Sequence, residues 1–275
     1  MTGVSRRTGG TVPIAYDVAG TGPAVVLLHG TSASHAVWDP VVDVLRTSAT
    51  AIALDQRGHG RSAKPPVGYA ADDFAADVVH VLDDLSLERA VVVGHSLGAR
   101  NAWVAAARYP DRIAAAVCVD YTPFVAPAVL NDLRDRVAAG HRAFADIDEV
   151  EEYLAARYVR LPPDAVARRA RAGYRRDADG RWWPLADPSA MSHLIDGFGR
   201  EWAEEFEAAA VPMVHVRGVD SRIVDHDAWD RARRLRPRDR WIVVDGADHY
   251  VPEECPDLVA AETLDLLNAV LPSSI

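Results

Sequence analysis

Five residues, Gly94-His95-Ser96-Leu97-Gly98, restrict the possible folds of this chain more than any other feature of its sequence. They follow the apolar run 90–93 and precede a stretch with helical spacing, which is the context of a Gly-x-Ser-x-Gly turn between a strand and a helix. Such a turn strains the serine backbone and excludes large side chains on either side, a demand that the two glycines meet. It also leaves the N–H of Leu97 at the start of a helix, where it can stabilise a developing oxyanion. The pattern predicts that Ser96 is a nucleophile.

A serine hydroxyl is a weak nucleophile until a histidine takes its proton and a carboxylate orients that histidine. In enzymes with this turn, the chain order is serine, acid, histidine. His249 follows the strand-like run 241–244 and precedes the last helical segment, so we expect it to be the base. Five other histidines lie in helical or cap-like segments, inside a strand or at the start of a polar helix, and we assign them packing or solvated roles: His80, His141, His193, His215 and His226.

Five motifs occur in a fixed order along most of the chain. They are 25–30 with Trp38 downstream, 55–62, the turn at 94–98, 211–218, and 246–249 with Glu254 and Pro256. With these motifs the chain resembles the α/β-hydrolase fold superfamily, in its serine-nucleophile branch with a helical cap. The resemblance implies an α/β fold with a mostly parallel central sheet flanked by helices. It says little about the substrate, because this fold hosts many chemistries.

Strand-like and helix-like segments alternate through most of the chain, which predicts a mostly parallel sheet covered on both faces. We expect strands at 12–18, 24–28, 51–54 and 113–119, and helices at 36–46, 72–85 and 97–109. From 121 to 210 the pattern is helical and polar. The expected organisation is therefore a core of residues 1–120 and 211–275 with a helical cap inserted at 121–210. Arginines cluster at 157–181, and we favour a solvated helix face over an anion-binding face there.

Two aspartates compete for the role of the acid. The resemblance implies an acid three residues after Gly218, where this sequence has Ser221, and Asp220 stands one residue earlier. At a strand end, a shift of one residue can turn a side chain toward the opposite face. Asp120 ends the strand that follows the helix of the turn, a position at which some branches of the family carry the acid. We favour Asp120 over Asp220, and the alternative role for Asp120 is to brace the loop after it.

The resemblance places a second oxyanion donor at the backbone N–H of Thr31, beside that of Leu97. Aromatic side chains are expected to line the cleft between cap and core, which suggests a bulky apolar or aromatic substrate. Ordinary packing between cap and core is the alternative for each of them. The candidates for substrate contact are Trp38, Tyr121, Phe124, Trp183 and Tyr250.

The predicted chemistry is acyl transfer, in which Ser96, His249 and Asp120 hydrolyse an ester, a lactone, a thioester or an activated C–C bond. The resemblance leaves four alternatives open: a cofactor-free dioxygenase, a perhydrolase-like haloperoxidase, a biosynthetic enzyme that releases or cyclises acyl chains, and a non-catalytic ligand receptor. Haloalkane dehalogenases and epoxide hydrolases are disfavoured, because similar enzymes have an aspartate where this chain has Ser96.

The formal net charge of −10 argues against nucleic acid as a partner, because phosphates require a basic surface. The sequence has neither a run of 18 apolar residues nor an apolar segment within 1–20, so we expect no membrane span, no secretory signal and a cytoplasmic location. Cys118 and Cys255 lack the spacing of a metal site, and we predict no metal and no cofactor. The expected partner is a small-molecule substrate, and the oligomeric state is left open.

Overall fold

One mixed sheet forms the centre of the molecule. The computed structural model describes residues 4–200 and 202–271, and within them eight strands pair in the order β1-β2-β4-β3-β5-β6-β9-β10. The pairs β1–β2 and β2–β4 are antiparallel, and the other pairs are parallel. The strands are β1 (Val4–Arg7), β2 (Ala15–Ala19), β3 (Ala24–Leu28), β4 (Thr50–Asp55), β5 (Ala90–His95), β6 (Ile113–Val119), β9 (Met213–Gly218) and β10 (Arg240–Val244).

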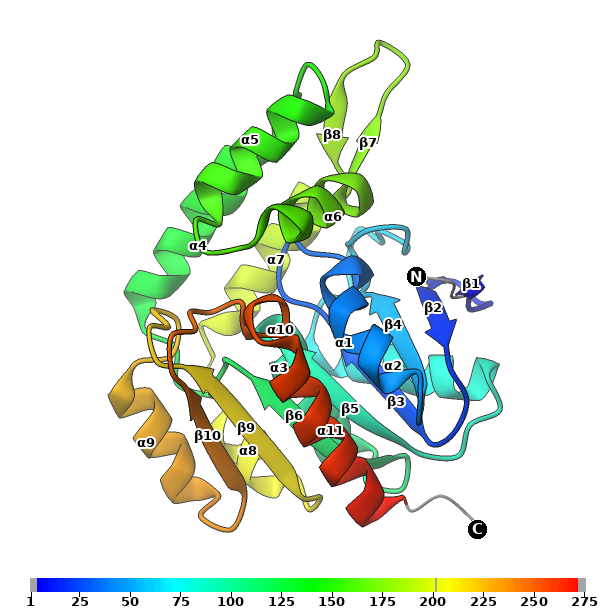
Figure 1. Cartoon of the computed structure of the whole chain (residues 1–275), viewed down its shortest axis with the longest axis vertical. Helices are drawn as coiled ribbons and strands as arrows, with labels where there is room; N and C mark the ends of the chain where they lie inside the picture. Colours follow the sequence, from blue (N-terminus) through cyan, green and yellow to red (C-terminus); the bar gives the residue numbers. More distant parts are fainter. Residues whose placement is uncertain (1–3, 201, 272–275) are drawn as a thin grey trace.

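Helices cover both faces of this sheet, as Figure 1 shows. Alternate residues of a strand point to opposite faces, so Val25 and Leu27 pack with helices α1 and α11, whereas Val26 and Leu28 pack with α2 and α3. The predicted mostly parallel sheet flanked by helices is therefore confirmed. The helices of the core are η1 (His35–Trp38), α1 (Asp39–Leu45), α2 (Ala71–Asp84), α3 (Leu97–Arg108), α8 (Ala203–Ala208), α9 (His226–Leu235), α10 (Val251–Glu254) and α11 (Pro256–Val270).

A cap inserted after β6 stands off the sheet (Figure 1). It consists of α4 (Pro127–Gly140), α5 (Ile147–Arg157), α6 (Pro163–Gly173), the hairpin β7 (Tyr174–Arg176) and β8 (Trp182–Pro184), and α7 (Pro188–Phe198). The hairpin was not expected, because its strands are only three residues long and the turn between them looks like a break between helices.

The expected cap, 121–210, also includes α8, which the structure places against the core. Phe206 of α8 lies with its ring centroid 5.0 Å from that of Trp103 in α3, and both side chains are fully buried. The segment that stands off the sheet therefore ends before α8. Edge strand β1 was not expected either, because its four residues are all exposed and lack the apolar alternation by which strands are recognised.

The carboxyl ends of the parallel strands meet at one edge of the sheet, beneath the cap. Thr31 follows β3, Ser96 follows β5, Asp120 follows β6 and His249 follows β10. The chain order reverses at β3, which pairs with β4 on one side and β5 on the other, and ligands of such sheets bind where the order reverses. In the described residues, no helix combines the length and the apolarity needed to cross a membrane.

Candidate active site

Ser96 occupies a strained turn between β5 and α3. Its backbone has φ 54° and ψ −116°, a conformation that side-chain-bearing residues rarely adopt, and its N–H donates to the carbonyl of Val119 at 2.9 Å. A Cβ at Gly94 would lie 2.1 Å from the carbonyl oxygen of Gly98, and one at Gly98 would lie 2.0 Å from that of Leu28. The turn can therefore form only with glycine at both positions, and it holds Ser96 above the end of the sheet.

Two backbone N–H groups near Ser96 are candidates for binding an oxyanion. Leu97 is the first residue of α3, so its N–H has no acceptor within the helix. The loop after β3 passes close to the serine, because a Cβ on Gly30 would lie 3.3 Å from Cβ of Ser96, and Thr31 follows in that loop. Ser96 and Thr31 line the same cavity. The arrangement fits an oxyanion hole made by the N–H groups of Thr31 and Leu97.

His249 and Asp120 form a largely buried hydrogen-bonded pair, and His249 lines the same cavity as Ser96. Nδ1 of His249 lies 2.6 Å from Oδ2 of Asp120. Since Nδ1 is engaged with the carboxylate, Nε2 is the ring nitrogen left for a serine hydroxyl. Asp120 accepts two further hydrogen bonds, from the hydroxyl of Ser221 at 2.5 Å and from the N–H of Gly218 at 3.0 Å. Three donors thus fix the orientation of the carboxylate.

The turn residue before the serine also positions His249. Nε2 of His95 lies 2.7 Å from the carbonyl oxygen of His249, and this nitrogen must carry the proton because a carbonyl can only accept. On the other side, the carboxylate of Glu254 accepts the N–H of Asp248 at 2.6 Å. The loop that carries His249 is therefore held from β5 and from α10. Sequence patterns gave no signal for the contact made by His95.

Burial shifts the pKa of both members of the pair. It lowers the pKa of His249 to about 3, with further lowering by the guanidinium groups of Arg136 and Arg169 against an opposing effect of Asp248. Burial raises the pKa of Asp120 to about 8, opposed by the hydrogen bonds from Ser221 and Gly218. The hydrogen bond between the two side chains opposes both shifts, because a carboxylate and an imidazolium stabilise each other. For a catalytic base the lowered pKa of His249 is the important shift, because it keeps the imidazole neutral.

Asp220 lies away from this pair. Its carboxylate accepts a hydrogen bond from Arg160 at 2.7 Å, and 53% of its side chain is exposed. Ser221, at the position where the resemblance implies an acid, instead donates its hydroxyl to Asp120. The geometry therefore brings Asp120, and not Asp220, to His249.

Ser96 and His249 line a cavity of about 60 Å³, which we call the Ser96 cavity. Tyr121 and Tyr250, two of the aromatic side chains expected to contact a substrate, line it as well. Much of the remaining wall is apolar and comes from the segment leading into α4, from α4 and α7, and from the loop after β9: Val125, Val129, Leu130, Leu133, Phe198 and Ile223.

The other three expected aromatic residues lie elsewhere. Trp38 is fully buried among the side chains of α1 and α11. The guanidinium of Arg231 lies 3.8 Å from the ring centroid of Phe124, and the indole N–H of Trp183 donates to Asp177 within the cap at 2.8 Å. The structure thus corrects the expected lining of the cavity: these three side chains pack or pair within the protein, and the residue type alone did not distinguish packing from lining.

Three arginines also line the Ser96 cavity. Arg136 of α4, Arg157 at the end of α5 and Arg169 of α6 all contribute to its wall. The sequence favoured a solvated face for the arginines of 157–181, and this is wrong for two of them. Arg169 is 7% exposed and forms a buried ion pair with Glu253, and Arg157 lies in the wall of the cavity.

A strained serine at the end of a central strand, with a largely buried histidine–aspartate pair at the same cavity, is the arrangement of an α/β hydrolase. The chain belongs to the α/β-hydrolase fold family: the family model described as alpha/beta hydrolase fold matches residues 23–256.

Known proteins similar to the chain include one with a named substrate. The chain is 39% identical over 267 residues to 2-(acetamidomethylene)succinate hydrolase of Mesorhizobium japonicum, with 97% of this chain and 96% of the relative covered. The crystal structure of E-2-(acetamidomethylene)succinate hydrolase superposes with a TM-score of 0.93 at 39% identity, covering 97% of this chain and 99% of that one. The enol-lactonase from Burkholderia xenovorans LB400 shares only the fold, with a TM-score of 0.77 at 18% identity and coverage of 96% and 100%.

Proposed function

We propose that this chain is a serine hydrolase that cleaves an amide or ester bond in a small substrate carrying carboxylate groups. In this proposal Ser96 is the nucleophile, His249 is the base and Asp120 orients the histidine. The carboxylate-bearing substrate replaces the bulky aromatic one that the sequence suggested, because three guanidinium groups line the cavity beside Tyr121 and Tyr250.

The charge of the Ser96 cavity is the observation that carries the proposal. In a chain of net charge −10, the described residues that line this cavity include Arg136, Arg157 and Arg169 but no aspartate or glutamate. Glu253 neutralises Arg169, and the carboxylate of Asp132 lies 3.8 Å from the guanidinium of Arg136. Arg157, in contrast, forms no ion pair with a carboxylate of a described residue. Such an enclosed positive site attracts anions, and planar guanidinium groups match the geometry of a carboxylate.

Tyr158 lines the same cavity, and the pKa of its phenol is sensitive to the positive charge of the nearby arginines. Burial alone would raise the pKa of its phenol, because it disfavours the charged form. The guanidinium groups of Arg157, Arg169 and Arg136 outweigh burial and hold the pKa of Tyr158 below its ordinary value of 10.0. The same guanidinium groups would stabilise a substrate carboxylate placed beside Tyr158, whereas burial dominates at Tyr250 in the same wall and raises the pKa of that phenol to about 12.

The relative's substrate agrees with this chemistry. As its name states, 2-(acetamidomethylene)succinate is a succinate, with two carboxylates, that bears an acetamide group. A substrate of this kind would place its carbonyl at Ser96 and its carboxylates toward the arginines. The direct test is incubation of this chain with 2-(acetamidomethylene)succinate and measurement of the acetate released. If neither this compound nor any aryl ester is hydrolysed, the proposal is wrong.

The reaction then proceeds by acyl transfer. Oγ of Ser96 attacks the carbonyl carbon while its proton passes to Nε2 of His249. The N–H groups of Thr31 and Leu97 hold the resulting oxyanion, each contributing about 3 kcal/mol if oxyanion-hole deletions elsewhere are a guide. The C–N or C–O bond breaks as His249 returns the proton to the leaving group. A water molecule, deprotonated by the same histidine, then attacks the acyl-enzyme and releases the acid.

Arg157→Met is expected to weaken the binding of carboxylate-bearing substrates. A charge-assisted hydrogen bond contributes about 1.5–3 kcal/mol, so kcat/KM for a dicarboxylate substrate should fall by roughly 10- to 150-fold, mainly through KM. Hydrolysis of an uncharged aryl acetate should fall much less. Arg171→Met is the matched control, because Arg171 is an exposed residue of α6 that lines neither described cavity. Equal losses for the charged and the neutral substrate would contradict a role in recognising carboxylates.

The pH dependence of kcat/KM should reflect the burial of His249. The base must be neutral to accept the proton of Ser96, so activity rises with pH through the pKa of this histidine. Because burial lowers that pKa from 6.5 to about 3, the rising limb should have its midpoint below 6.5. Steady-state rates measured between about pH 4 and pH 8 test this. A midpoint at or above the ordinary histidine value would contradict this and show that the bond to Asp120 outweighs burial.

A further inference from the structure

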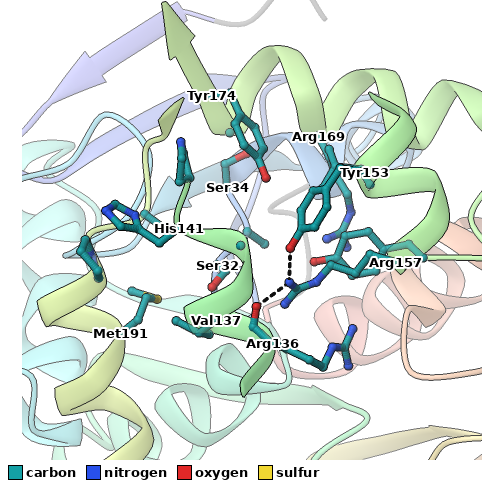
Figure 2. Close-up of a pocket in the computed structure, with 18 residues that line it drawn as sticks. Ser32, Ser34, Arg136, Val137, His141, Tyr153, Arg157, Arg169, Tyr174 and Met191 are labelled. Carbon is teal, nitrogen blue, oxygen red and sulfur yellow. Dashed lines mark hydrogen bonds between the residues drawn. The ribbon is translucent and has the colours of Figure 1, made fainter. Parts of the chain in front are cut away.

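A second cavity lies between the cap and the core loop after β3, next to the Ser96 cavity. We call it the cap chamber; its volume is about 50 Å³ and its wall includes Ser34, Gly140, His141, Tyr153, Gly173 and Tyr174. Figure 2 shows Arg157 and Tyr153 on one side of this space and His141 and Met191 on the other. The chain's proposed acyl-transfer chemistry does not use this chamber.

The cap chamber and the Ser96 cavity are neighbours along one face of α4. Leu130 and Leu133 line the Ser96 cavity, Arg136 lines both, and Val137 and Gly140 line the cap chamber. These positions recur every three or four residues, so they share one face of the helix. From Leu130 to Gly140 the face is about 15 Å long at 1.5 Å per residue. A ligand lying along α4 could therefore occupy both spaces.

The wall between the two spaces is positively charged. Both cavities are lined by Arg136, Arg157 and Arg169, and no described residue lining either one is an aspartate or a glutamate. Nη1 of Arg157 donates to the hydroxyl of Tyr153 and to the carbonyl of Arg136, both at 2.7 Å, as Figure 2 shows. Nε of Arg157 is buried and makes no hydrogen bond to a described residue. The hydroxyl of Tyr153, which accepts from Arg157, keeps its own proton to donate.

We propose that the cap chamber binds a carboxylate at the far end of an extended acyl substrate whose reactive carbonyl lies at Ser96. The inference rests on the proposed serine-hydrolase function, and it adds that the substrate reaches past the arginine wall. Arg157 holds the carboxylate from α5, while Tyr153 and His141 offer additional donors. The chamber then sets the length of the acyl chain that the enzyme accepts.

Gly173, at the end of α6, allows the chamber to be filled without disturbing the protein. It lines the chamber, and no atom lies within 4 Å of the position that a Cβ would take, apart from the neighbours and the helix backbone. Alanine and leucine are also better helix formers than glycine, so the substitutions Gly173→Ala and Gly173→Leu should fold. Gly9→Leu is the matched control, because Gly9 is exposed, has equally open space around it and lies far from the cap in the sequence.

The experiment measures kcat/KM for p-nitrophenyl half-esters of dicarboxylic acids of increasing length, from succinate to suberate, and for uncharged p-nitrophenyl esters of the same lengths. The wild-type enzyme should prefer a long half-ester to the uncharged ester of equal length. Gly173→Leu should lower kcat/KM for the long half-esters by about 10-fold or more, the size of effect that one misplaced methylene has in a pocket. Gly173→Ala should have an intermediate effect, and Gly9→Leu should match wild type on every ester.

The outcomes separate the two proposals. If the wild-type enzyme hydrolyses no ester in the series, the proposed hydrolase function fails and the role of the chamber fails with it. If esters are hydrolysed but Gly173→Leu keeps the wild-type length profile, only the role of the chamber is overturned. Equal rates for charged and uncharged esters of each length would overturn the proposal that the chamber binds a carboxylate. A thermal unfolding midpoint close to that of wild type establishes that Gly173→Leu is folded.

Discussion

Ser96→Ala is expected to lose essentially all hydrolytic activity, a fall of roughly 10⁶-fold in kcat if the loss of the nucleophile in subtilisin is a guide. The substitution removes the attacking oxygen and nothing else. Alanine keeps the Cβ that Ser96 already accommodates at φ 54°, so the strain of the turn does not change. Steady-state kinetics with an aryl ester and labelling by a fluorophosphonate probe should both fall to background.

A second serine with the same φ value provides the control. Ser86 also has φ 54°, but it is exposed, follows the end of α2 and does not line the Ser96 cavity. Ser86→Ala should retain wild-type activity and probe labelling. Full activity in Ser96→Ala would end the proposal of a serine nucleophile. Partial activity would favour a mechanism in which His249 acts only as a base, as in the cofactor-free dioxygenases considered among the alternatives.

The position of Ser96 could be predicted because the restriction on it is local. The turn needs glycine on both sides for steric reasons that involve only the adjoining strands and helix, so five residues and their flanking pattern specify it. The same holds for the alternation of apolar strands and helices that gives the sheet. The loop residues Thr31, Asp120 and His249 follow strands of one parallel sheet, and their common edge follows from that topology.

The composition of the cavity wall could not be predicted in the same way. A polar helix has a similar pattern whether its polar face meets solvent or encloses a cavity, and Arg157 and Arg169 therefore looked like surface residues. Their burial depends on how α4, α5 and α6 pack against one another and on Glu253, which lies 84 residues from Arg169. Aromatic residues raise the same difficulty. Trp38 and Tyr121 are both buried in the core, but only Tyr121 also lines the cavity.

The choice between Asp120 and Asp220 could be predicted less firmly than the position of Ser96 and more firmly than the cavity wall. The sequence favoured Asp120 only through a resemblance to some branches of the family, since the pattern around Gly218 is shifted by one residue. The geometry gives a physical reason for the shift. Ser221 occupies the position implied for the acid and donates its hydroxyl to Oδ2 of Asp120, the same oxygen that contacts His249. The serine thus supports a carboxylate supplied from β6, whereas Asp220 turns outward to Arg160.

Asp120→Asn should therefore lower kcat by about 10⁴-fold, the loss seen when the acid of a serine-protease triad becomes an amide. The amide fills the same space, but it cannot stabilise the imidazolium. Its NH₂ group can donate to Nδ1 of His249, and the ring proton then sits on Nε2, which can no longer accept the proton of Ser96. Asp220→Asn is the matched control: it makes the same chemical change one residue before Ser221, on a side chain that is 53% exposed, and it should keep kcat close to wild type. Both variants should bind substrate with little change in KM, because neither carboxylate lines the Ser96 cavity. If Asp220→Asn loses the activity and Asp120→Asn keeps it, Asp120 only braces the loop after β6, and a different acid orients His249 during turnover.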